Sequence, residues 1–349
     1  MKGILIYIGT TLGLILFMEF FLQITEISLP NPIAVDSKIG KVLQPDSRIN
    51  LIKEGLYLGK VNEYGYLGPG YPKERKANTI RIALMGDSYV EAYQLFEKFN
   101  FRTVIEDELN KTSDKKVEVL NFGRSGMSFG TMYTYYENFV KEFSPDIVLF
   151  IIGQDDFVIK NQSLFPGLEI NSEGELVFNK KFKESYLFKL REKYNFIFNF
   201  STFDLIKKSA KLVEEGYAAH ILFDKLNPEL LFNTGKKLTA EIEQTDEGKV
   251  ADANSIAVLS KIFSNFNSES STTFAMAARG ELANDYVKLI QENQIHYLKL
   301  YKYVSSLKTP DFDPNYWKAS NKYGHWNHRA HQLIGKYLAN YIRSELMTD

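Results

Sequence analysis

The sequence predicts an α/β fold in which a parallel sheet is covered by helices on both faces. Three apolar runs of strand length, at 80–86, 117–121 and 147–152, alternate with helical patterns at 98–110 and 129–142. This βαβαβ order is typical of parallel sheets, because a parallel connection needs a crossover that a helix provides. Ligands of such sheets bind at the carboxyl ends of the strands, so the residues after each run are the first candidates for a site.

The first apolar run ends at Gly86-Asp87-Ser88, where a strand gives way to a helix. A serine at such a turn has an exposed hydroxyl and a forward-pointing backbone N–H, as a nucleophile requires. Gly, Asp and Ser are also the ordinary residues of turns, so the tripeptide alone fits a plain turn equally well. Ser88 is the candidate nucleophile if the neighbouring loops support it.

The second and third runs end in polar loops of the same kind. The second leads into a glycine-bearing loop that contains Gly126, and the third is closed by Gly153-Gln154-Asp155-Asp156. Near the C-terminus, His325 precedes a helical pattern that begins near residue 328. We expect the three loops and the histidine to form one site at one edge of the sheet.

This combination resembles the SGNH hydrolases, also called GDSL-like esterases, over residues 60–160 and 310–345. The resemblance implies a three-layer flavodoxin-like sheet, with Ser88 as nucleophile, Gly126 in the oxyanion hole and His325 as general base. It implies a serine esterase or O-acyltransferase that acts on an acyl-ester substrate of a cell-surface glycan. The expected acyl group is acetyl, and no cofactor is expected. Membrane-anchored relatives often work beside a multi-spanning membrane acyltransferase, which is the partner that the resemblance suggests.

The chain departs from the family pattern at two polar positions. Asp155 stands where the family has an asparagine, and an ionised carboxylate cannot donate a hydrogen bond to an oxyanion. The neighbouring Gln154 has an amide that can, so both residues stay open for this place in the oxyanion hole. The family's orienting aspartate before the histidine is also missing, and three residues remain as replacements: Asp156, Asp311 and Asp313. These departures make a catalytically degenerate binding or assembly protein of the cell envelope the alternative function.

Composition excludes several other classes. The chain has 349 residues, 44% hydrophobic and 24% charged, and its net charge of -1 gives no basic surface for nucleic acid. It has no cysteine, so disulfides and thiolate metal sites are excluded. His328 and His331 are three residues apart on the predicted last helix, yet no carboxylate stands beside them at ligand spacing. We therefore expect no metal there.

The N-terminus predicts an uncleaved transmembrane signal anchor over residues 1–25. Gly3–Ile24 is almost entirely apolar and long enough to cross a bilayer, and no small-x-small cleavage site follows it. Lys2 on the short side places the catalytic domain outside the cytoplasm. Glu19 interrupts the segment, and we expect it near the interface or, if deeper, paired with a second membrane protein.

The remaining boundaries follow from composition and pattern. Residues 26–78 predict a linker or packing segment, in which 61–69 packs on the SGNH hydrolase-like domain of 79–349, as an edge hairpin. Within that domain, residues 160–305 predict a helical insertion that acts as a lid, a substrate wall or a docking surface.

Overall fold

A computed structural model describes residues 2–30, 32–52, 54–158, 164–214 and 253–347. The chain divides into two compact units. The first unit, here called the N-terminal unit, comprises Met1–Asn31 and Tyr194–Gly248. The second, here called the sheet unit, comprises Pro32–Lys193 and Lys249–Asp349.

The sheet unit is built on a five-stranded sheet in the order β11-β10-β7-β5-β6, and every pair in it is parallel. Its strands are β5 (Thr79–Gly86), β6 (Lys116–Asn121), β7 (Ile147–Ile152), β10 (Thr273–Ala278) and β11 (His296–Leu298). Numbered along the chain, the order is 2-1-3-4-5, which is the flavodoxin-like arrangement. The predicted fold class is therefore confirmed.

Alternate residues of each strand enter two separate cores, one on each face of the sheet. In β5, Ile82 and Leu84 lie in one core, whereas Ala83 and Met85 lie in the other. The first core is closed by α3 (Phe101–Asn110), α11 (Leu300–Ser306) and α12 (His328–Tyr341), and the second by α4 (Phe129–Asn138), α9 (Ala253–Ser268) and α10 (Asn284–Glu292). The sheet strands read as continuous apolar runs because both of their faces are covered.

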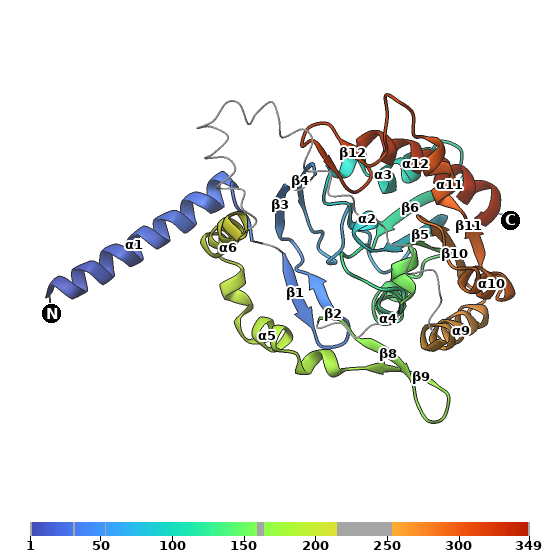
Figure 1. The fold of residues 1–349 in the computed structure, drawn as a ribbon, viewed down its shortest axis with the longest axis horizontal. Helices are drawn as coiled ribbons and strands as arrows, with labels where there is room; N and C mark the ends of the chain where they lie inside the picture. The colour runs from blue at the N-terminus through green and yellow to red at the C-terminus, as the bar shows by residue number, and fades with distance from the viewer. Residues whose placement is uncertain (1, 31, 53, 159–163, 215–252, 348–349) are drawn as a thin grey trace. The chain divides into compact units, whose positions relative to one another are not determined.

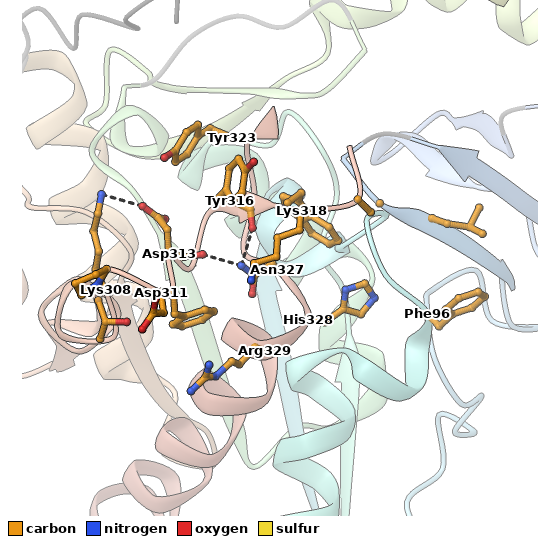
Figure 2. Close-up of a pocket in the computed structure, with 17 residues that line it drawn as sticks. Phe96, Lys308, Asp311, Asp313, Tyr316, Lys318, Tyr323, Asn327, His328 and Arg329 are labelled. Atoms are coloured by element: carbon orange, nitrogen blue, oxygen red, sulfur yellow. Dashed lines mark hydrogen bonds and ion pairs between the residues drawn. The ribbon is translucent and has the colours of Figure 1, made fainter. Parts of the chain in front are cut away.

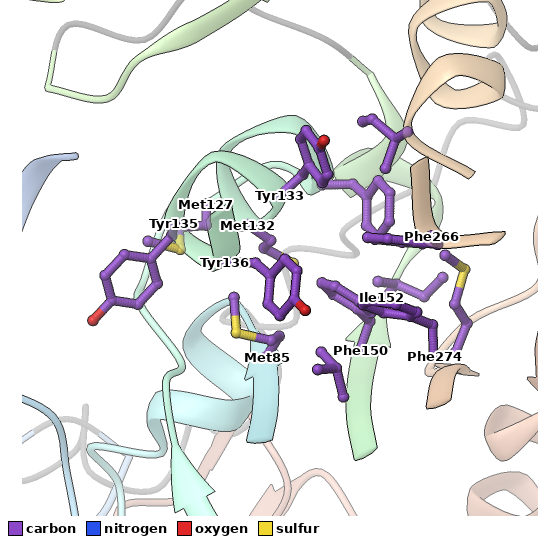
Figure 3. Close-up of a cluster of buried hydrophobic side chains, with 14 of the residues drawn as sticks. Met85, Met127, Met132, Tyr133, Tyr135, Tyr136, Phe150, Ile152, Phe266 and Phe274 are labelled. Atoms are coloured by element: carbon purple, nitrogen blue, oxygen red, sulfur yellow. The ribbon is translucent and has the colours of Figure 1, made fainter. Parts of the chain in front are cut away.

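The second core is strongly aromatic. Phe266 of α9 stacks on Phe274 of β10, with ring centroids 3.9 Å apart and planes inclined by 11°, and Phe266 also stacks on Phe150 of β7. Figure 3 shows these rings, with Met132 and Tyr136 of α4 on the same side of the sheet. The core thus fixes β7 and β10 beside each other, so that their carboxyl ends face the same edge.

Residues 160–305 do not form a purely helical insertion, which corrects the prediction. Helix α9 lies there, but β10 and β11 are strands of the central sheet, and α10 is a crossover helix between them. The run Thr273–Ala278 contains three alanines and a methionine, which are strong helix formers. A short buried apolar run of this kind cannot be assigned to helix or strand by its periodicity.

Residues 26–78 contain more regular structure than a linker. Two antiparallel hairpins are present, formed by β1 (Ile33–Asp36) with β2 (Gly40–Leu43) and by β3 (Arg48–Ile52) with β4 (Leu56–Lys60). Leu67 bridges both Val61 and Asn121, the last residue of the edge strand β6. The expectation that 61–69 packs against the domain at a sheet edge is confirmed.

Shorter helices and strands also belong to the sheet unit. They are α2 (Ser88–Glu91), β8 (Gly167–Ile170), β9 (Leu176–Asn179), β12 (Tyr316–Trp317) and β13 (Lys322–Tyr323), and α5 (Tyr186–Phe198) runs from this unit into the N-terminal unit.

The N-terminal unit contains α1 (Lys2–Thr25) and α6 (Ser201–Glu214). Among the described residues, α1 is the one helix long and apolar enough to cross a membrane. Within the unit, α6 lies beside the C-terminal part of α1 (Figure 1). Within 160–305, the amphipathic pattern over 203–217 predicts a helix; α6 matches it up to Glu214, and residues 215–217 lie outside the described residues.

Candidate active site

Ser88 is the first residue of α2, at the point where β5 ends. The Asp87 side chain accepts a hydrogen bond from the Tyr89 N–H at 2.9 Å, which caps the short helix and fixes the turn. A Cβ on Gly86 would lie 2.3 Å from the Val90 side chain and 3.0 Å from the Ile151 carbonyl. Glycine is therefore required there for α2 to approach the sheet, and this approach presents the serine at the carboxyl edge.

His325 lies between β13 and α12, and its Nε2 is 2.8 Å from the Ser88 Oγ. The structure thus brings these two candidate residues into hydrogen-bond contact. The His325 backbone is held because its carbonyl accepts a hydrogen bond from Trp317 Nε1 at 2.8 Å. Asn327 caps α12 two residues later by accepting from the Ala330 N–H at 3.1 Å.

Glu54 supplies the carboxylate that faces the other nitrogen of the imidazole. Its Oε1 lies 2.8 Å from His325 Nδ1, and its carbonyl accepts a hydrogen bond from the Ser320 hydroxyl at 2.6 Å. Burial raises the pKa of Glu54, but the hydrogen bond and charge of His325 outweigh it and lower this pKa from 4.5 to about 2. Glu54 is thus ionised at neutral pH and holds the imidazole with its Nε2 toward the serine.

None of the three aspartates expected to orient His325 is its partner, which corrects that prediction. Asp156 accepts a hydrogen bond from the Gly153 N–H at 2.7 Å, and Asp313 pairs with Lys308 at 2.8 Å. Asp311 is exposed on the surface. The turn of the β3–β4 hairpin carries Glu54. This glutamate occupies the position beside the imidazole that the three aspartates were expected to fill.

The sequence held no signal for Glu54. It lies 271 positions before His325, in a segment that predicted a linker, and outside the two stretches that carry the resemblance. A glutamate in a hairpin turn is an ordinary surface residue, and its role depends on tertiary packing.

Gly126 lies in the loop after β6, the strand next to β5 in the sheet. Its φ is +87°, which favours glycine, and an added Cβ would meet nothing within 4 Å. The loop is fastened to its neighbours, because the Ser125 N–H donates to Glu91 of α2 and the Arg124 N–H donates to the Gly86 carbonyl, both at 3.0 Å. Gly126 therefore opens onto free space from a loop held against α2 and the end of β5.

Gln154 and Asp155 lie in the short helical turn Gln154–Phe157 that follows β7. The Gln154 Oε1 accepts a hydrogen bond from the Ala283 N–H at 2.8 Å, which fixes the orientation of the carboxamide. Asp155 is exposed. Of the two candidates for the third oxyanion donor, Gln154 is therefore held in one orientation by a hydrogen bond, whereas Asp155 is exposed to solvent.

Arg279 is a second residue near this site that the sequence did not reveal. It follows β10 and pairs with Asp87 at 3.0 Å and with Asp156 at 3.2 Å, and its guanidinium lies over the Tyr89 ring. Burial raises the pKa of Asp156, and the charge of Arg279 opposes this shift. The arginine therefore links the turn before Ser88 to the loop after β7. It was missed because β10 was read as part of a helical insertion.

The two late histidines have packing contacts. His331 is buried, and its Nδ1 accepts a hydrogen bond from the Phe101 N–H, the first residue of α3, at 3.1 Å. His328 packs against the rings of Phe99 and Trp317.

A cavity of about 1100 Å³ is lined by the segments that carry Glu54 and His325 (Figure 2). Its walls include Gly55, which follows Glu54, and Tyr323 and Asn327, which flank His325 in the sequence. The Asn327 amide donates to the carbonyls of Asp313 and Tyr316 at 2.8 and 2.9 Å, which ties the wall together. The lining combines aromatic rings with charged groups, as in sites that bind polar organic ligands.

No family model and no curated protein sequence matches the chain. Solved structures similar to it include a psychrotrophic esterase from Pseudoalteromonas sp., with 13% identity and a TM-score of 0.39, covering 78% of this chain and 100% of the other. A catalytic mutant of an acetylxylan esterase from Geobacillus stearothermophilus has 11% identity and a TM-score of 0.38, covering 77% and 97%. A lipolytic protein of the G-D-S-L family from Desulfitobacterium hafniense has 11% identity and a TM-score of 0.33, covering 74% and 98%.

The sheet order and the contact between the predicted serine and histidine are observations on this chain itself. They agree with the motifs in the sequence, where four blocks occur in the expected order. The chain thus has the flavodoxin-like sheet that its resemblance to the SGNH hydrolases implies, with Ser88 and His325 in contact at the carboxyl edge of that sheet.

Proposed function

We propose that the protein is a serine esterase or O-acyltransferase of the SGNH type, with Ser88 as nucleophile, His325 as general base and Glu54 as its orienting carboxylate. The observation that carries the proposal is the continuous relay of two 2.8 Å contacts from the serine hydroxyl through the imidazole to the carboxylate. Such a relay activates a hydroxyl that is otherwise a weak nucleophile at neutral pH.

In the proposed reaction, His325 Nε2 takes the Ser88 proton while Oγ attacks the ester carbonyl. The tetrahedral oxyanion collapses, the ester C–O bond breaks, and the imidazolium returns the proton to the departing alcohol. Water or an acceptor hydroxyl then loses its proton to His325 and attacks the acyl-serine. The bond between Ser88 Oγ and the acyl carbon breaks, an acid or a new ester is released, and the imidazolium returns the proton to Ser88 Oγ. Glu54 stays ionised throughout and stabilises the imidazolium.

The oxyanion is held by backbone N–H groups in this proposal. Ser88 is the first residue of α2, and the first N–H groups of a helix have no partner within it. Gly126 would contribute a second N–H from the neighbouring loop. Gln154 is the better supported third donor, because a carboxamide donates hydrogen bonds and this one is already oriented by Ala283.

The binding-protein alternative loses part of its support. It was motivated by two missing polar roles, and Glu54 fills one of them from a different part of the chain. A complete relay of serine, histidine and carboxylate in a part-buried site is the arrangement that a serine esterase needs. Enzymatic activity is therefore the function that the geometry supports best.

The proposed substrate is an acyl ester, expected to be acetyl, carried by a cell-surface glycan. Support comes from the cavity of about 1100 Å³, which exposes the paired rings of Tyr316 and Tyr323, 5.2 Å apart, beside Lys318. Aromatic faces and polar groups together suit sugar rings. We place the glycan part of the substrate there, and we propose α1 as the anchor that keeps the sheet unit outside the cytoplasm, near a multi-spanning acyltransferase partner.

Hydrolysis of a small acetyl ester by the purified full-length chain tests the relay. Ser88→Ala and His325→Ala are expected to abolish turnover, and Glu54→Gln to lower kcat by about 100- to 10,000-fold, since the imidazole loses its oriented tautomer. Asp313→Asn is the matched control, because it changes a carboxylate that does not bond His325. Turnover that survives Ser88→Ala would contradict the proposal.

Comparison of a small ester with an acetylated oligosaccharide tests the cavity. Tyr323→Ala removes an exposed ring of the cavity and is expected to raise KM for the oligosaccharide several-fold. The same variant is expected to leave hydrolysis of the small ester unchanged. Equal effects on both substrates would count against a glycan site in this cavity.

A further inference from the structure

The N-terminal unit exposes a run of large apolar side chains on and just before α6. Five of them lie within eleven residues, and each is more than a third exposed: Phe196 62%, Ile197 38%, Phe200 41%, Phe203 38% and Ile206 63%. Single exposed apolar residues are normal on a soluble surface, but a contiguous set marks an interaction surface. We call these five residues the apolar face of the unit.

Helix α6 is attached to α1 through Glu19. One carboxylate oxygen accepts the Ser201 N–H at 2.9 Å, and the other accepts the Thr202 N–H at 2.8 Å and the Thr202 hydroxyl at 2.9 Å. These are the first N–H groups of α6, which have no partners within the helix, and a negative charge is favourable at that end. The charged residue that interrupts the apolar helix α1 therefore serves as the N-terminal cap of α6.

A second contact fixes which side of α6 faces inward. The Ser28 hydroxyl donates to Asp204 at 3.0 Å, and both side chains are buried. Ser201 is fully buried as well, and Leu22 is buried in α1 beside it. Because Ser201 and Asp204 point inward, Phe203 and Ile206 lie on the outward side of the helix.

The position of Glu19 along α1 sets the depth at which α6 begins. A hydrocarbon core of about 30 Å takes roughly 20 helical residues, so a span that starts at Gly3 ends near Leu22. Glu19 then lies about one turn inside the far boundary of the hydrocarbon. The N-terminus of α6 is held at that depth, in the zone where lipid chains meet headgroups.

We propose that residues 196–206 form a second membrane element, with the apolar face immersed in the interfacial layer of the bilayer that α1 crosses. Lipid is the occupant that the structure favours, because the apolar face continues the exposed apolar surface of α1, on which Phe20 and Phe21 are 65% and 44% exposed. An amphipathic segment with Phe and Ile outward is typical of helices that lie in this layer. Glu19 docks this segment and so replaces the second membrane protein as the partner expected for its charge.

Collision accessibility of spin labels tests the proposal in the full-length chain, reconstituted in phosphatidylcholine vesicles. The chain has no cysteine, so single-cysteine variants can be labelled without removing native residues. Labels at Phe203→Cys and Ile206→Cys are expected to collide mainly with dissolved oxygen, as a label at Leu12→Cys in α1 does. A label at Lys115→Cys, in an exposed loop of the sheet unit, is expected to collide mainly with a water-soluble nickel complex.

Each other outcome would overturn the proposal. Collisions at 203 and 206 like those at 115 would mean that the face is in water. Protection from both reagents would mean that protein covers the face, and dipolar broadening between labels would identify a second copy of the chain as that cover.

A Glu19→Ala variant tests the docking separately. Its α1 is more apolar and is expected to stay in the membrane after high-salt washing, whereas the label at 203 is expected to gain mobility and nickel accessibility. Glu19→Gln keeps one acceptor oxygen and is expected to fall between the two. An unchanged label at 203 in Glu19→Ala would contradict the role given to this carboxylate.

Discussion

At the scale of single residues, the candidate site combines a serine, a histidine and a glutamate. Motifs predict the serine and the histidine, whereas no motif indicates the glutamate. Ser88 and His325 are held by local devices, the capped turn of α2 and the bond from Trp317 to the His325 carbonyl. Glu54 is held by a hairpin turn and by its bond from Ser320. The serine therefore depends on the sheet edge for its position, whereas the orienting carboxylate depends on a peripheral hairpin.

The third oxyanion donor gives the sharpest prediction at this scale. If Gln154 donates, Gln154→Ala is expected to raise the activation barrier of ester hydrolysis by about 2 to 4 kcal/mol, and Asp155→Asn to change it little. If Asp155 occupies the place, Asp155→Asn is expected to raise turnover, because a carboxylate repels the tetrahedral anion. Steady-state kinetics of both variants distinguishes them, and no change in either would remove both residues from the oxyanion hole.

Residue chemistry also explains what the sequence could and could not reveal here. The Ser88 turn and the Gly126 loop follow apolar runs immediately, so local pattern was enough to select them. Glu54 and Arg279 act through contacts with residues far along the chain, at His325 and Asp87. Their residue types are common on surfaces, and only the folded arrangement assigns them a role.

At the scale of elements, the strands of the central sheet that contain isoleucine or valine were predicted, whereas β10, in which threonine is the one β-branched residue, was not. β5 and β7 are rich in isoleucine, which favours strands, whereas β10 reads Thr-Phe-Ala-Met-Ala-Ala. The sheet recruits β10 because it pairs with β7 along six residues and stacks Phe274 on Phe266. Pairing within the sheet thus overrides the helical preference of this sequence. The helical part of residues 160–305 is therefore smaller than predicted.

The packing of α12 on α3 gives a pH-dependent prediction. Burial, aided by the charges of His328 and His325, lowers the pKa of His331 from 6.5 to about 3, so protonation favours the unfolded chain. The free energy of unfolding is therefore expected to fall as pH decreases from 6.5 toward 3, with a slope from this group of up to about 1.4 kcal/mol per pH unit.

Urea unfolding followed by tryptophan fluorescence measures this effect, because both tryptophans, Trp317 and Trp326, lie in the sheet unit. His331→Gln cannot titrate and is expected to show a flatter decline over the same pH range, whatever its stability at pH 7. Parallel declines in the two proteins would show that other groups cause the acid sensitivity.

At the scale of the whole molecule, the chain combines the sheet unit with an N-terminal unit that contains its apolar helix. The last turns of α1 contact α6 through Glu19 and bury Leu22, so removal of α1 would take away the cap of α6 and leave its first N–H groups without these acceptors. These contacts give α1 a structural role in the folded chain. A signal peptide that is cleaved would not have such a role.

Retention of α1 is therefore predicted in the mature protein. The membrane-extracted chain is expected to begin at Met1 or Lys2 and to resist extraction by high salt, because about 20 apolar residues anchor it in the bilayer. N-terminal sequencing of the protein purified from its native membranes measures this. A mature N-terminus between residues 25 and 32 would contradict it.

The central claim is that Ser88 is activated by the relay through His325 to Glu54, and labelling by a fluorophosphonate probe tests it most directly. The full-length chain, in native membranes and after purification, is expected to carry one adduct on Ser88, located by peptide mass spectrometry. Ser88→Ala is expected to carry none, and His325→Ala and Glu54→Gln to react more slowly in that order of severity. Absence of any adduct on Ser88 in native membranes, or labelling at an undiminished rate in His325→Ala, would contradict the account.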